Sequence, residues 1–373
     1  MLKRMNFDYT IITILFAFGV ISTMLIYSAT SGTKYEGMHV DHLVTYAVFF
    51  VLMLVCSLFD YKGILYPLVY ILYAVGIVLQ VLVLFIGDEH LGARRWIDLG
   101  FVQFQPSELM KILLVMAIAR FMARREGAPL DFVRDVVPIL LMTLLPFVLI
   151  MRQPDLGTSL VFIAIFIGMV WIGNIRKKHV LLMGLCLVGC VLVVASLYFI
   201  NYELFSKIIR PHQMERIQTF LNPDADPENA YHVNNAKRAI SVGQLAGAGW
   251  NNGYHVQRSL VPFTYSDSIF VVVGEEFGFI GSAVLLLLYF MLIYRMIYIA
   301  LECQDLFSRY LIVGVATMMS FQIFVNIGMH LGLLPLTGVP LPFMSYGRTS
   351  LLLNIISVGL VLSIRNNELA RKS

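Results

Sequence analysis

The sequence predicts an all-α polytopic membrane protein with ten transmembrane helices and one long extracytoplasmic loop. Three observations predict this fold class. Of the 373 residues, 59% are hydrophobic and 13% are charged, and the mean hydropathy is +0.80. Soluble proteins carry about 45–50% apolar and about 25% charged residues, so ordinary cores could not bury this apolar excess. The apolar residues also form long runs, and basic residues are concentrated in alternate connecting segments.

The apolar runs are close to the about 17–25 residues that a spanning helix needs. The first follows Lys3 and Arg4, but it is longer than a signal-peptide core and lacks a small-residue cleavage site, so we expect it to remain as a helix. No internal repeat is visible. A single integral membrane domain, 1–373, is expected to hold spans at 9–28, 42–59, 63–86, 106–123, 136–151, 156–174, 179–200, 268–299, 309–333 and 347–364, with the long outer loop at 201–267.

The distribution of basic residues predicts the orientation. With the N-terminus in the cytoplasm, the short outer loops hold only Lys34, Arg94, Arg95 and Arg152. The cytoplasmic segments then hold thirteen basic residues: Lys3, Arg4, Lys62, Arg124, Arg125, Arg134, Arg176, Lys177, Lys178, Arg309, Arg365, Arg371 and Lys372. Because cytoplasmic loops are enriched in Lys and Arg, both termini are expected in the cytoplasm and the 201–267 segment outside.

Several classes of function are disfavoured. The net charge of +4 gives no indication of a nucleic-acid partner. The four cysteines, Cys56, Cys186, Cys190 and Cys303, lie in or beside apolar runs and suggest no disulfide framework. The sequence has no phosphate-binding loop, dinucleotide fingerprint or nucleophile elbow, so nothing indicates a nucleotide-driven pump.

Charged side chains inside a membrane are costly, so each one within a span is a candidate functional residue. Glu108 and Lys111 lie in the first turns of the fourth span, after Pro106. Residues three apart share one helix face, so the two side chains are expected to pair. The alternative is a purely structural pair, and we favour function because such pairs seldom stabilise better than apolar packing.

Asp267 stands at the outer start of the eighth span, and Glu275 and Glu276 follow about 12 Å further along it. A carboxylate beside apolar residues at a membrane boundary is suited to proton abstraction. The alternative for Asp267 is a helix N-cap. For Glu275 and Glu276, structural partners on other helices are an equal alternative.

Further outer-face candidates come from the connecting loops. Asp155 has the position of an N-cap for the sixth span and is also a weaker catalytic candidate. Arg94 and Arg95 could bind a pyrophosphate through charge-assisted hydrogen bonds, or could anchor the chain at the interface beside Trp96. His39, Asp41 and His42 share a loop, but without a further ligand they do not predict a metal site.

The long outer segment contains two patterns. Residues 222–227 are rich in Asn, Asp and Pro and are expected to form a turn. Tyr231–Val242 has apolar residues at helical spacing with Lys237 and Arg238 beside them, which suggests a short interfacial helix; an ordinary covering loop is the alternative.

Six stretches, in order along the chain, resemble the SEDS family (shape, elongation, division and sporulation). They are Arg94-Arg95-Trp96-Ile97-Asp98-Leu99-Gly100; Gln105-Pro106-Ser107-Glu108 with Lys111; Gln153-Pro154-Asp155-Leu156-Gly157-Thr158; Phe220-Leu221-Asn222-Pro223; Asp267 followed by Gly274-Glu275-Glu276-Phe277-Gly278; and Asn326-Ile327-Gly328-Met329 through Gly338-Val339-Pro340-Leu341-Pro342-Phe343 to Ser345-Tyr346-Gly347. The sequence Gln153-Pro154-Asp155, with Gly249-Trp250, favours the RodA branch, which serves cell elongation and rod shape, over the FtsW branch, which serves division.

The resemblance implies a peptidoglycan glycosyltransferase that polymerises lipid II at the outer face of the bacterial cytoplasmic membrane. It implies a class B penicillin-binding protein as transpeptidase partner, with other membrane proteins of the elongation machinery as further partners. It places the family's essential aspartate at Asp267 and its functional Glu and Lys at Glu108 and Lys111. The chain departs from the family pattern in three places: Tyr265-Ser266-Asp267-Ser268 stands where His-Thr-Asp-Phe is common, Arg348 replaces the second Gly after Ser-Tyr, and the loop around Ala230–Asn235 fits poorly.

The chemistry implied by this substrate assigns roles to the candidate residues. Joining α-linked lipid II through a β-1,4 bond inverts the anomeric carbon, which requires a base and a cation for the leaving pyrophosphate. Asp267 is the expected base, Glu108 would orient Lys111, and the cations are Arg94, Arg95, Lys111 and Arg348. A divalent cation, Mg or Mn, could help, although the sequence shows no clear ligand set. A lipid II flippase and a non-catalytic scaffold for a transpeptidase are the alternative functions.

Overall fold

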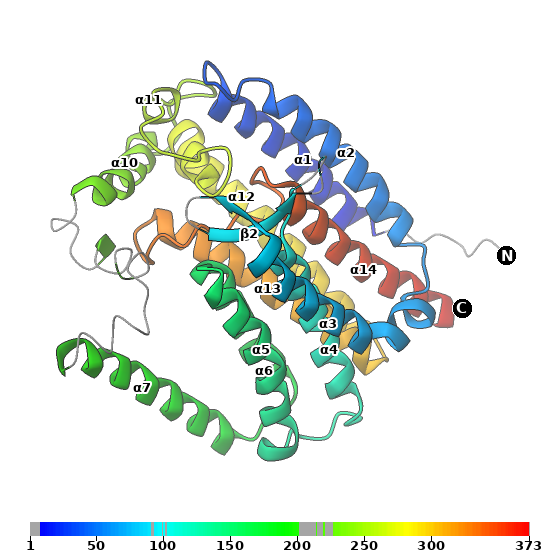
Figure 1. The fold of residues 1–373 in the computed structure, drawn as a ribbon. Helices are drawn as coiled ribbons and strands as arrows, with labels where there is room; N and C mark the ends of the chain where they lie inside the picture. The colour runs from blue at the N-terminus through cyan, green and yellow to red at the C-terminus, as the bar shows by residue number, and fades with distance from the viewer. Residues whose placement is uncertain are drawn as a thin grey trace.

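The computed structural model describes residues 8–90, 93–98, 100, 103–200, 214, 219–220 and 227–372. The predicted turn at 222–227, apart from Pro227, and the predicted cytoplasmic residues Lys3 and Arg4 lie outside the described residues. A helix is present at each of the ten ranges expected to span the membrane (Figure 1). The helix-rich fold class expected from the apolar runs is therefore confirmed.

The helices begin and end within four residues of the expected limits, except that α14 continues eight residues beyond its expected end. They are α1 (Tyr9–Thr30), α2 (Met38–Cys56), α3 (Tyr61–Ile86), α4 (Pro106–Ala123), α5 (Val137–Arg152), α6 (Leu156–Ile172), α7 (Lys177–Ile200), α12 (Ile269–Glu302), α13 (Leu306–His330) and α14 (Arg348–Lys372). A short π-helix, η1 (Phe132–Val136), precedes α5. Asp8, Asp60, Asp155 and Asp305 are N-caps whose carboxylates accept backbone N–H groups of the helix that follows.

Within the described residues, seven helices are long and apolar enough to cross a membrane. They are α1, α2, α3, α5 with η1, α12, α13 and α14, and α6 is a shorter apolar helix. Helix α4 is less apolar because Glu108, Lys111 and Arg120 all lie on it, yet most of its residues are buried among its neighbours. The chain is thus an integral membrane protein, and the exact number of crossings remains a prediction.

A small antiparallel sheet was not predicted. Strands β1 (Asp88–His90), β2 (Ala93–Asp98) and β3 (Gln103–Phe104) pair in the order β1-β2-β3 between α3 and α4. The strands are too short, and too rich in charged residues, to show a period-two pattern in the sequence. The sheet carries Arg94 and Arg95, so it places two of the candidate residues.

The segments predicted to face outside gather at one end of the helix bundle. The hydroxyl of Tyr346, just before α14, donates to Asp41 of α2 at 2.7 Å, and Thr349 of α14 donates to the carbonyl of Gln103 in β3 at 2.7 Å. Arg95 of β2 reaches the turn between α5 and α6. We call this end the outer end, after the orientation that the basic residues predict.

The segments predicted to be cytoplasmic meet at the opposite end. Asp8 accepts Arg295 at 2.8 Å and Arg365 at 2.6 Å, and Lys62 pairs with Asp305 at 2.8 Å. Burial alone would raise the Asp305 pKa, but hydrogen bonds from Lys62 and Ser308 outweigh it and hold the pKa below its usual value. The two ends thus separate as the topology requires.

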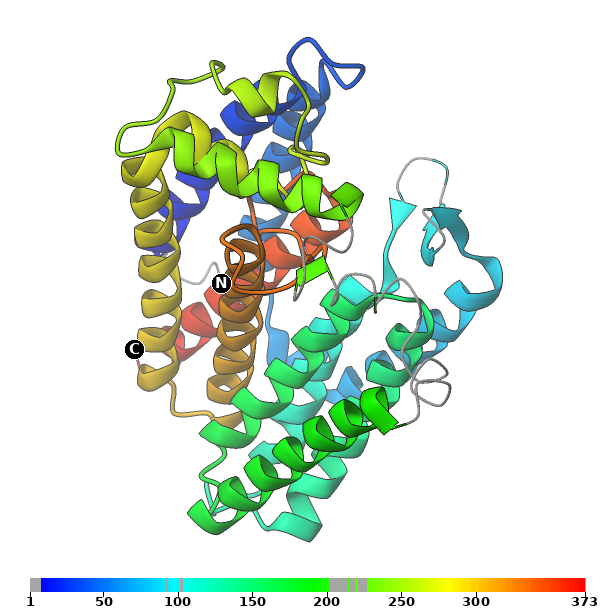
Figure 2. The ribbon, with the colours of Figure 1, turned by 90° about the vertical axis from the view of Figure 1, so that its left-hand side faces the viewer.

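The long outer segment contains the expected helix, α10 (Pro227–Gly243), followed by the one-turn helix α11 (Tyr254–Gln257). Helix α10 lies across the outer end and packs on α12 (Figure 2). Small residues allow this close approach: a Cβ added at Gly243 would lie 1.9 Å from the carbonyl oxygen of Gly274. The interfacial-helix interpretation of Tyr231–Val242 is therefore correct as to its secondary structure.

Helix α12 is interrupted at Gly278, whose φ of 63° and ψ of −154° favour glycine. The segment 244–249 lies along the break and replaces the lost helical hydrogen bonds. The carbonyls of Gln244 and Leu245 accept the N–H groups of Phe279 and Ile280 at 2.9 and 3.1 Å. In return, the carbonyls of Glu275 and Glu276 accept the N–H groups of Ala248 and Gly249 at 2.9 and 3.0 Å. This exchange fixes the outer loop to the bundle.

Helix α7 lies apart from the main bundle in Figure 1. Many of its residues are exposed, including Leu181, Leu185 and Leu192, each more than 60% accessible. Apolar side chains exposed to this degree are typical of a helix surrounded by lipid.

Candidate active site

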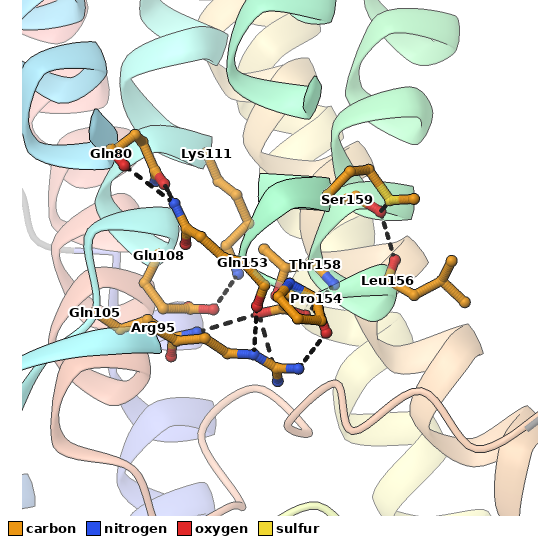
Figure 3. Close-up of polar contacts among 12 residues, drawn as sticks. Gln80, Arg95, Gln105, Glu108, Lys111, Gln153, Pro154, Leu156, Thr158 and Ser159 are labelled. Atoms are coloured by element: carbon orange, nitrogen blue, oxygen red, sulfur yellow. Dashed lines mark hydrogen bonds and ion pairs between the residues drawn. The ribbon is translucent and has the colours of Figure 1, made fainter. Parts of the chain in front are cut away.

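The predicted pair of Glu108 and Lys111 is present in the first turns of α4. The Lys111 Nζ atom lies 2.8 Å from Glu108 Oε1, and each side chain is 3% exposed. Figure 3 shows both side chains on the same side of α4, toward the turn between α5 and α6. Pro106 occupies the first turn of the helix, where its missing N–H costs nothing. The pair is thus a buried charge pair close to the outer end.

Asp155 is the N-cap of α6, and its Oδ1 accepts the N–H of Thr158 at 3.1 Å. Its other oxygen lies 3.4 Å from Gln105 Nε2 and 3.9 Å from Arg95 Nη1. Capping accounts for one oxygen of this carboxylate, so the structural role expected for Asp155 is confirmed. The second oxygen thus faces Gln105, the N-cap residue of α4, whose first turns carry Glu108.

Arg95 fixes the turn between α5 and α6. Its Nε donates to the carbonyl of Gln153 at 3.1 Å and its Nη2 donates to the carbonyl of Pro154 (Figure 3). The side chain of Gln153 in turn donates to Gln80 Oε1 of α3 at 2.6 Å. The guanidinium of Arg95 therefore holds protein carbonyls, whereas its neighbour Arg94 is exposed on β2.

The backbone at Asp267 is held by two side chains from α13. Asn326 Nδ2 donates to the Asp267 carbonyl at 2.7 Å, and His330 Nε2 donates to the same oxygen at 2.9 Å. The second N–H of Asn326 reaches the carbonyl of Val339 at 2.8 Å. These bonds tie the start of α12 to the segment that follows α13.

The Asp267 carboxylate is not a helix cap. Ser268 is the N-cap of α12, and no side chain caps that end. Oxygen Oδ2 of Asp267 lies beside Gly338, where an added Cβ would approach it to 3.3 Å. Among the residues that the structure describes, no hydrogen bond or ion pair involves this carboxylate, although the Asp267 main chain is fixed. It is a positioned, partly accessible carboxylate at the outer end.

The segment around Gly338 lies between Asp267 and the first turn of α6. On one side Gly338 contacts Asp267, and on the other a Cβ added at Gly157 would meet the carbonyl oxygen of Thr337 at 2.6 Å. The cap of α6 at Asp155 and the start of α12 at Asp267 thus face the same connecting segment. Within the described ranges, no ion pair or hydrogen bond joins Asp267 directly to Glu108 or Lys111.

Arg348 pairs with Asp41 of α2, which sequence reasoning did not find. Arg348 Nη2 lies 2.6 Å from Asp41 Oδ1, and the hydroxyl of Tyr346 donates to Asp41 Oδ2 at 2.7 Å. Burial, followed by the hydrogen bond to Asp41, raises the pKa of Tyr346 to about 12. Arg348, which departs from the family pattern, is therefore paired with a carboxylate on α2, a helix that is far from it in the sequence but packs against α14.

The three residues considered as metal ligands lie on the first turns of α2 rather than in a loop, and they do not form a metal site. Asp41 is engaged by Arg348, and His42 Nε2 lies 2.9 Å from Ser22 Oγ. Across the described ranges, no group of three His, Cys, Asp or Glu side chains could hold a metal ion.

Glu275 and Glu276 have the structural partners considered as an alternative. Glu275 accepts the N–H groups of His255 and Val256 at 2.8 and 3.0 Å, and Glu276 accepts the N–H of Asn251 at 3.1 Å. Both carboxylates are buried and hold the outer loop. Sequence reasoning missed Asn326 and His330 as positioning residues, although two polar residues four apart on the apolar helix α13 are a usable signal.

A bundle of apolar helices with buried charges and a positioned carboxylate at one end defines a polytopic membrane protein with a polar site at the membrane boundary. Residues 6–369 match the FtsW/RodA/SpoVE family, described as cell cycle proteins. The chain therefore belongs to this family, and the resemblance noted in its motifs is confirmed.

Two relatives illustrate the similarity. Peptidoglycan glycosyltransferase MrdB of Escherichia coli (strain K12) is 34% identical over 371 residues, which cover 98% of this chain and 95% of that protein. Stage V sporulation protein E of Bacillus subtilis (strain 168) is 36% identical over 282 residues, covering 75% and 73%.

Solved structures agree with the fold. A chain from a study of how a peptidoglycan synthase complex coordinates polymerization and crosslinking has a TM-score of 0.81 and 30% identity, covering 98% of this chain and 99% of that one. The rod shape determining protein RodA of Thermus thermophilus has a TM-score of 0.71 and 28% identity, covering 97% and 98%.

Proposed function

We propose that this protein is a peptidoglycan glycosyltransferase that polymerises lipid II at the outer face of the cytoplasmic membrane, in the elongation of rod-shaped cells. The observation that carries the proposal is the Asp267 carboxylate. The main-chain carbonyl of Asp267 is held by Asn326 and His330, while the two carboxylate oxygens have no hydrogen-bond partner among the described residues. The name of the Escherichia coli relative supports the same activity.

The reaction is a single displacement at the anomeric carbon. The acceptor hydroxyl oxygen attacks this carbon, the new β-1,4 carbon–oxygen bond forms, and the bond to the α-linked pyrophosphate breaks. Asp267 takes the hydroxyl proton, and polyprenyl pyrophosphate leaves with the bonding electron pair. A base fixed within hydrogen-bond reach of the attacking hydroxyl gives typically 10²–10⁴-fold acceleration.

Glu108 and Lys111 form the second part of the proposed site. Lys111 is the candidate for substrate charge, and Glu108 orients it through the 2.8 Å contact. Because the pair is buried at the outer end, it is shielded from bulk water, which strengthens its electrostatic effect on a nearby phosphate.

The remaining substrate-binding candidates have roles that the contacts refine. Arg95 and Asp155 position the turn between α5 and α6, so they are proposed to shape the site rather than to carry the phosphate charge. Arg94 and Arg348 lie at the accessible rim of the outer end. Arg348 would bind an anion only in competition with Asp41.

Orientation and partners complete the proposal. The basic residues favour cytoplasmic termini, which places Asp267 outside, where peptidoglycan is assembled. A class B penicillin-binding protein would cross-link the new strands, and the similarity to a chain of a peptidoglycan synthase complex supports such a partner.

The experiment is polymerisation of fluorescent lipid II by the purified protein, with and without its cognate transpeptidase, read as a glycan ladder on a gel. We expect ladders that are insensitive to penicillin, since transpeptidation is not required for chain growth. If no ladder forms with the partner present, while lipid II crosses the membrane of proteoliposomes that contain the protein, the function is transport. If neither occurs, the scaffold alternative holds.

A further inference from the structure

The proposed reaction needs a cation at the leaving pyrophosphate, and most of the expected cations are already engaged. Arg95 donates to the carbonyls of Gln153 and Pro154, Lys111 pairs with Glu108, and Arg348 pairs with Asp41. An anion would have to displace these partners before it could bind. A cation that has no such partner can bind the leaving phosphate alongside Lys111 without this cost.

Lys237 of α10 has the required properties. It is half-buried, and its side chain lies over Gly332, just beyond the end of α13. A Cβ added at Gly332 would lie 2.4 Å from Lys237 Nζ and 2.2 Å from Cε. In the described part of the chain, the Lys237 ammonium takes part in no hydrogen bond or ion pair. It is a cation held in place by packing rather than by a counter-charge.

The packing of α10 places this lysine at the edge of the helix's buried face. Ala236 and Ala239 are buried against Val261 and Val271, which places that face of α10 on α12. Lys237 follows Ala236 and is partly covered at the edge of the same face, while the next residue, Arg238, is exposed. Two adjacent basic residues on one helix therefore have different surroundings.

Lys237 is not needed as a cap for α13. The N–H of Leu333 donates to the carbonyl of Gly328 at 2.8 Å, and the N–H of Gly332 reaches the carbonyl of Met329 at 3.4 Å. With Gly332 at a φ of +74°, these two bonds form a Schellman motif, which already satisfies the carbonyls of the last turn. The ammonium is thus left available for a ligand.

The end of α13 also connects Lys237 to the proposed base. His330, two residues before Gly332, donates to the Asp267 carbonyl at 2.9 Å. The Lys237 side chain and the main chain of Asp267 therefore both contact the end of α13, Lys237 from α10 at Gly332 and Asp267 from the start of α12 at His330.

We propose that Lys237 binds the pyrophosphate of the polyprenyl-linked donor and stabilises its negative charge as it leaves. This inference rests on the proposed function. As the anomeric carbon–oxygen bond breaks, its electron pair passes to the phosphate oxygen, and the Lys237 ammonium donates hydrogen bonds to that phosphate without losing a proton. Asp267 takes the acceptor proton, so the two residues serve opposite sides of the same displacement.

The test compares four proteins of equal yield and thermal stability in complex with the transpeptidase: wild type, Lys237→Met, Lys237→Arg and Arg238→Met. Arg238→Met is a matched control, because it also removes one positive charge, from the next residue along the helix, which is exposed. Two quantities are measured for each: kcat for polymerisation at saturating lipid II, and the affinity for undecaprenyl pyrophosphate compared with the affinity for undecaprenol.

Lys237→Met is expected to lower kcat roughly tenfold or more, in line with the loss of one preorganised donor. It should weaken undecaprenyl pyrophosphate binding by a similar factor and leave undecaprenol binding unchanged. Lys237→Arg should retain most of both properties, and Arg238→Met should stay within about twofold of wild type.

The proposal is overturned if Lys237→Met and Arg238→Met behave alike, or if Lys237→Met weakens both lipids equally, since undecaprenol carries no phosphate. Failure of the proposed function gives a different result. In that case wild type forms no glycan, yet the comparison of the two lipids still decides whether Lys237 recognises a pyrophosphate.

Discussion

Removing one member of the Glu108–Lys111 pair should destabilise the protein more than removing both. The two charged atoms are 2.8 Å apart and each side chain is 3% exposed, so Glu108→Gln leaves an ammonium with almost no access to water. Unit charges about 4 Å apart attract by about 4 kcal/mol at an effective dielectric constant of 20. Breaking a buried pair costs about 3–5 kcal/mol, because the remaining charge is uncompensated. We expect a loss of this size in the free energy of unfolding for Glu108→Gln.

The assay is steric-trap unfolding in bicelles for Glu108→Gln, Lys111→Met and the double variant. Ser107→Ala is the control, because Ser107 is the neighbouring buried polar residue and its hydroxyl has no hydrogen-bond partner within the described ranges. Its loss should cost about 1 kcal/mol or less. The double variant should lose far less than the sum of the single variants.

Additive single losses would refute this reasoning, since they would show that the two charges do not stabilise each other. Losses below about 1 kcal/mol for both single variants would do the same, because they are typical of solvent-exposed pairs. A double variant that is folded but forms no glycan would assign the pair a role in catalysis as well as in stability.

Three further predictions concern the outer loop, the interrupted helix and the cytoplasmic end. Glu275→Gln should speed amide hydrogen exchange in α11 while leaving α13 protected, because it weakens acceptors of buried N–H groups worth about 1–3 kcal/mol; unchanged exchange in α11 would contradict the role of this carboxylate. Gly278→Ala should lower the free energy of unfolding by about 1–3 kcal/mol or more, because the φ of Gly278 is 63° and the new Cβ would lie 2.5 Å from a backbone atom. The control is Gly184→Ala on α7, where an added Cβ has nothing within 4 Å. In the same unfolding assay this control should be neutral or stabilising. The pKa of the Asp305 carboxyl is lowered on folding, so this group stabilises the folded state above the unfolded pKa of about 3.9 and loses that contribution as the pH falls below it. Asp305→Asn should therefore flatten the acid limb of the curve of stability against pH. An unchanged limb would show that the contact with Lys62 contributes little.

The helices could be predicted because membrane burial imposes a length and a composition on each of them. The pairing of Glu108 with Lys111 could be predicted as well, because a spacing of three within one helix fixes the distance. Both are local properties of the sequence. They require no knowledge of which helices are neighbours.

The partners of the other candidate residues depend on contacts between distant segments. Arg348 and Asp41 are separated by 307 positions, so nothing in either local sequence indicates the ion pair. The sheet that carries Arg95 consists of short charged strands without alternation. For the same reason, the sequence could propose Arg95 as a phosphate ligand but could not show that protein carbonyls already occupy its guanidinium.

Asp267 shows how a sequence-based hypothesis can be sharpened by structure. The sequence left open whether this residue caps α12, and the structure places Ser268 at the cap instead. It also shows that the Asn326 side chain fixes the main chain at Asp267.

The measurement that tests the account most directly is polymerisation of lipid II by Asp267→Asn, in complex with the transpeptidase and at matched yield and thermal stability. Asp98→Asn is the control, because Asp98 is an exposed aspartate on β2 whose carboxylate accepts the N–H of Gly100 at 2.7 Å. We predict glycan ladders from wild type and Asp98→Asn, and a loss of 10²-fold or more in rate for Asp267→Asn, about the value of a general base. Ladders from Asp267→Asn at the wild-type rate would contradict the assignment of Asp267 as the base.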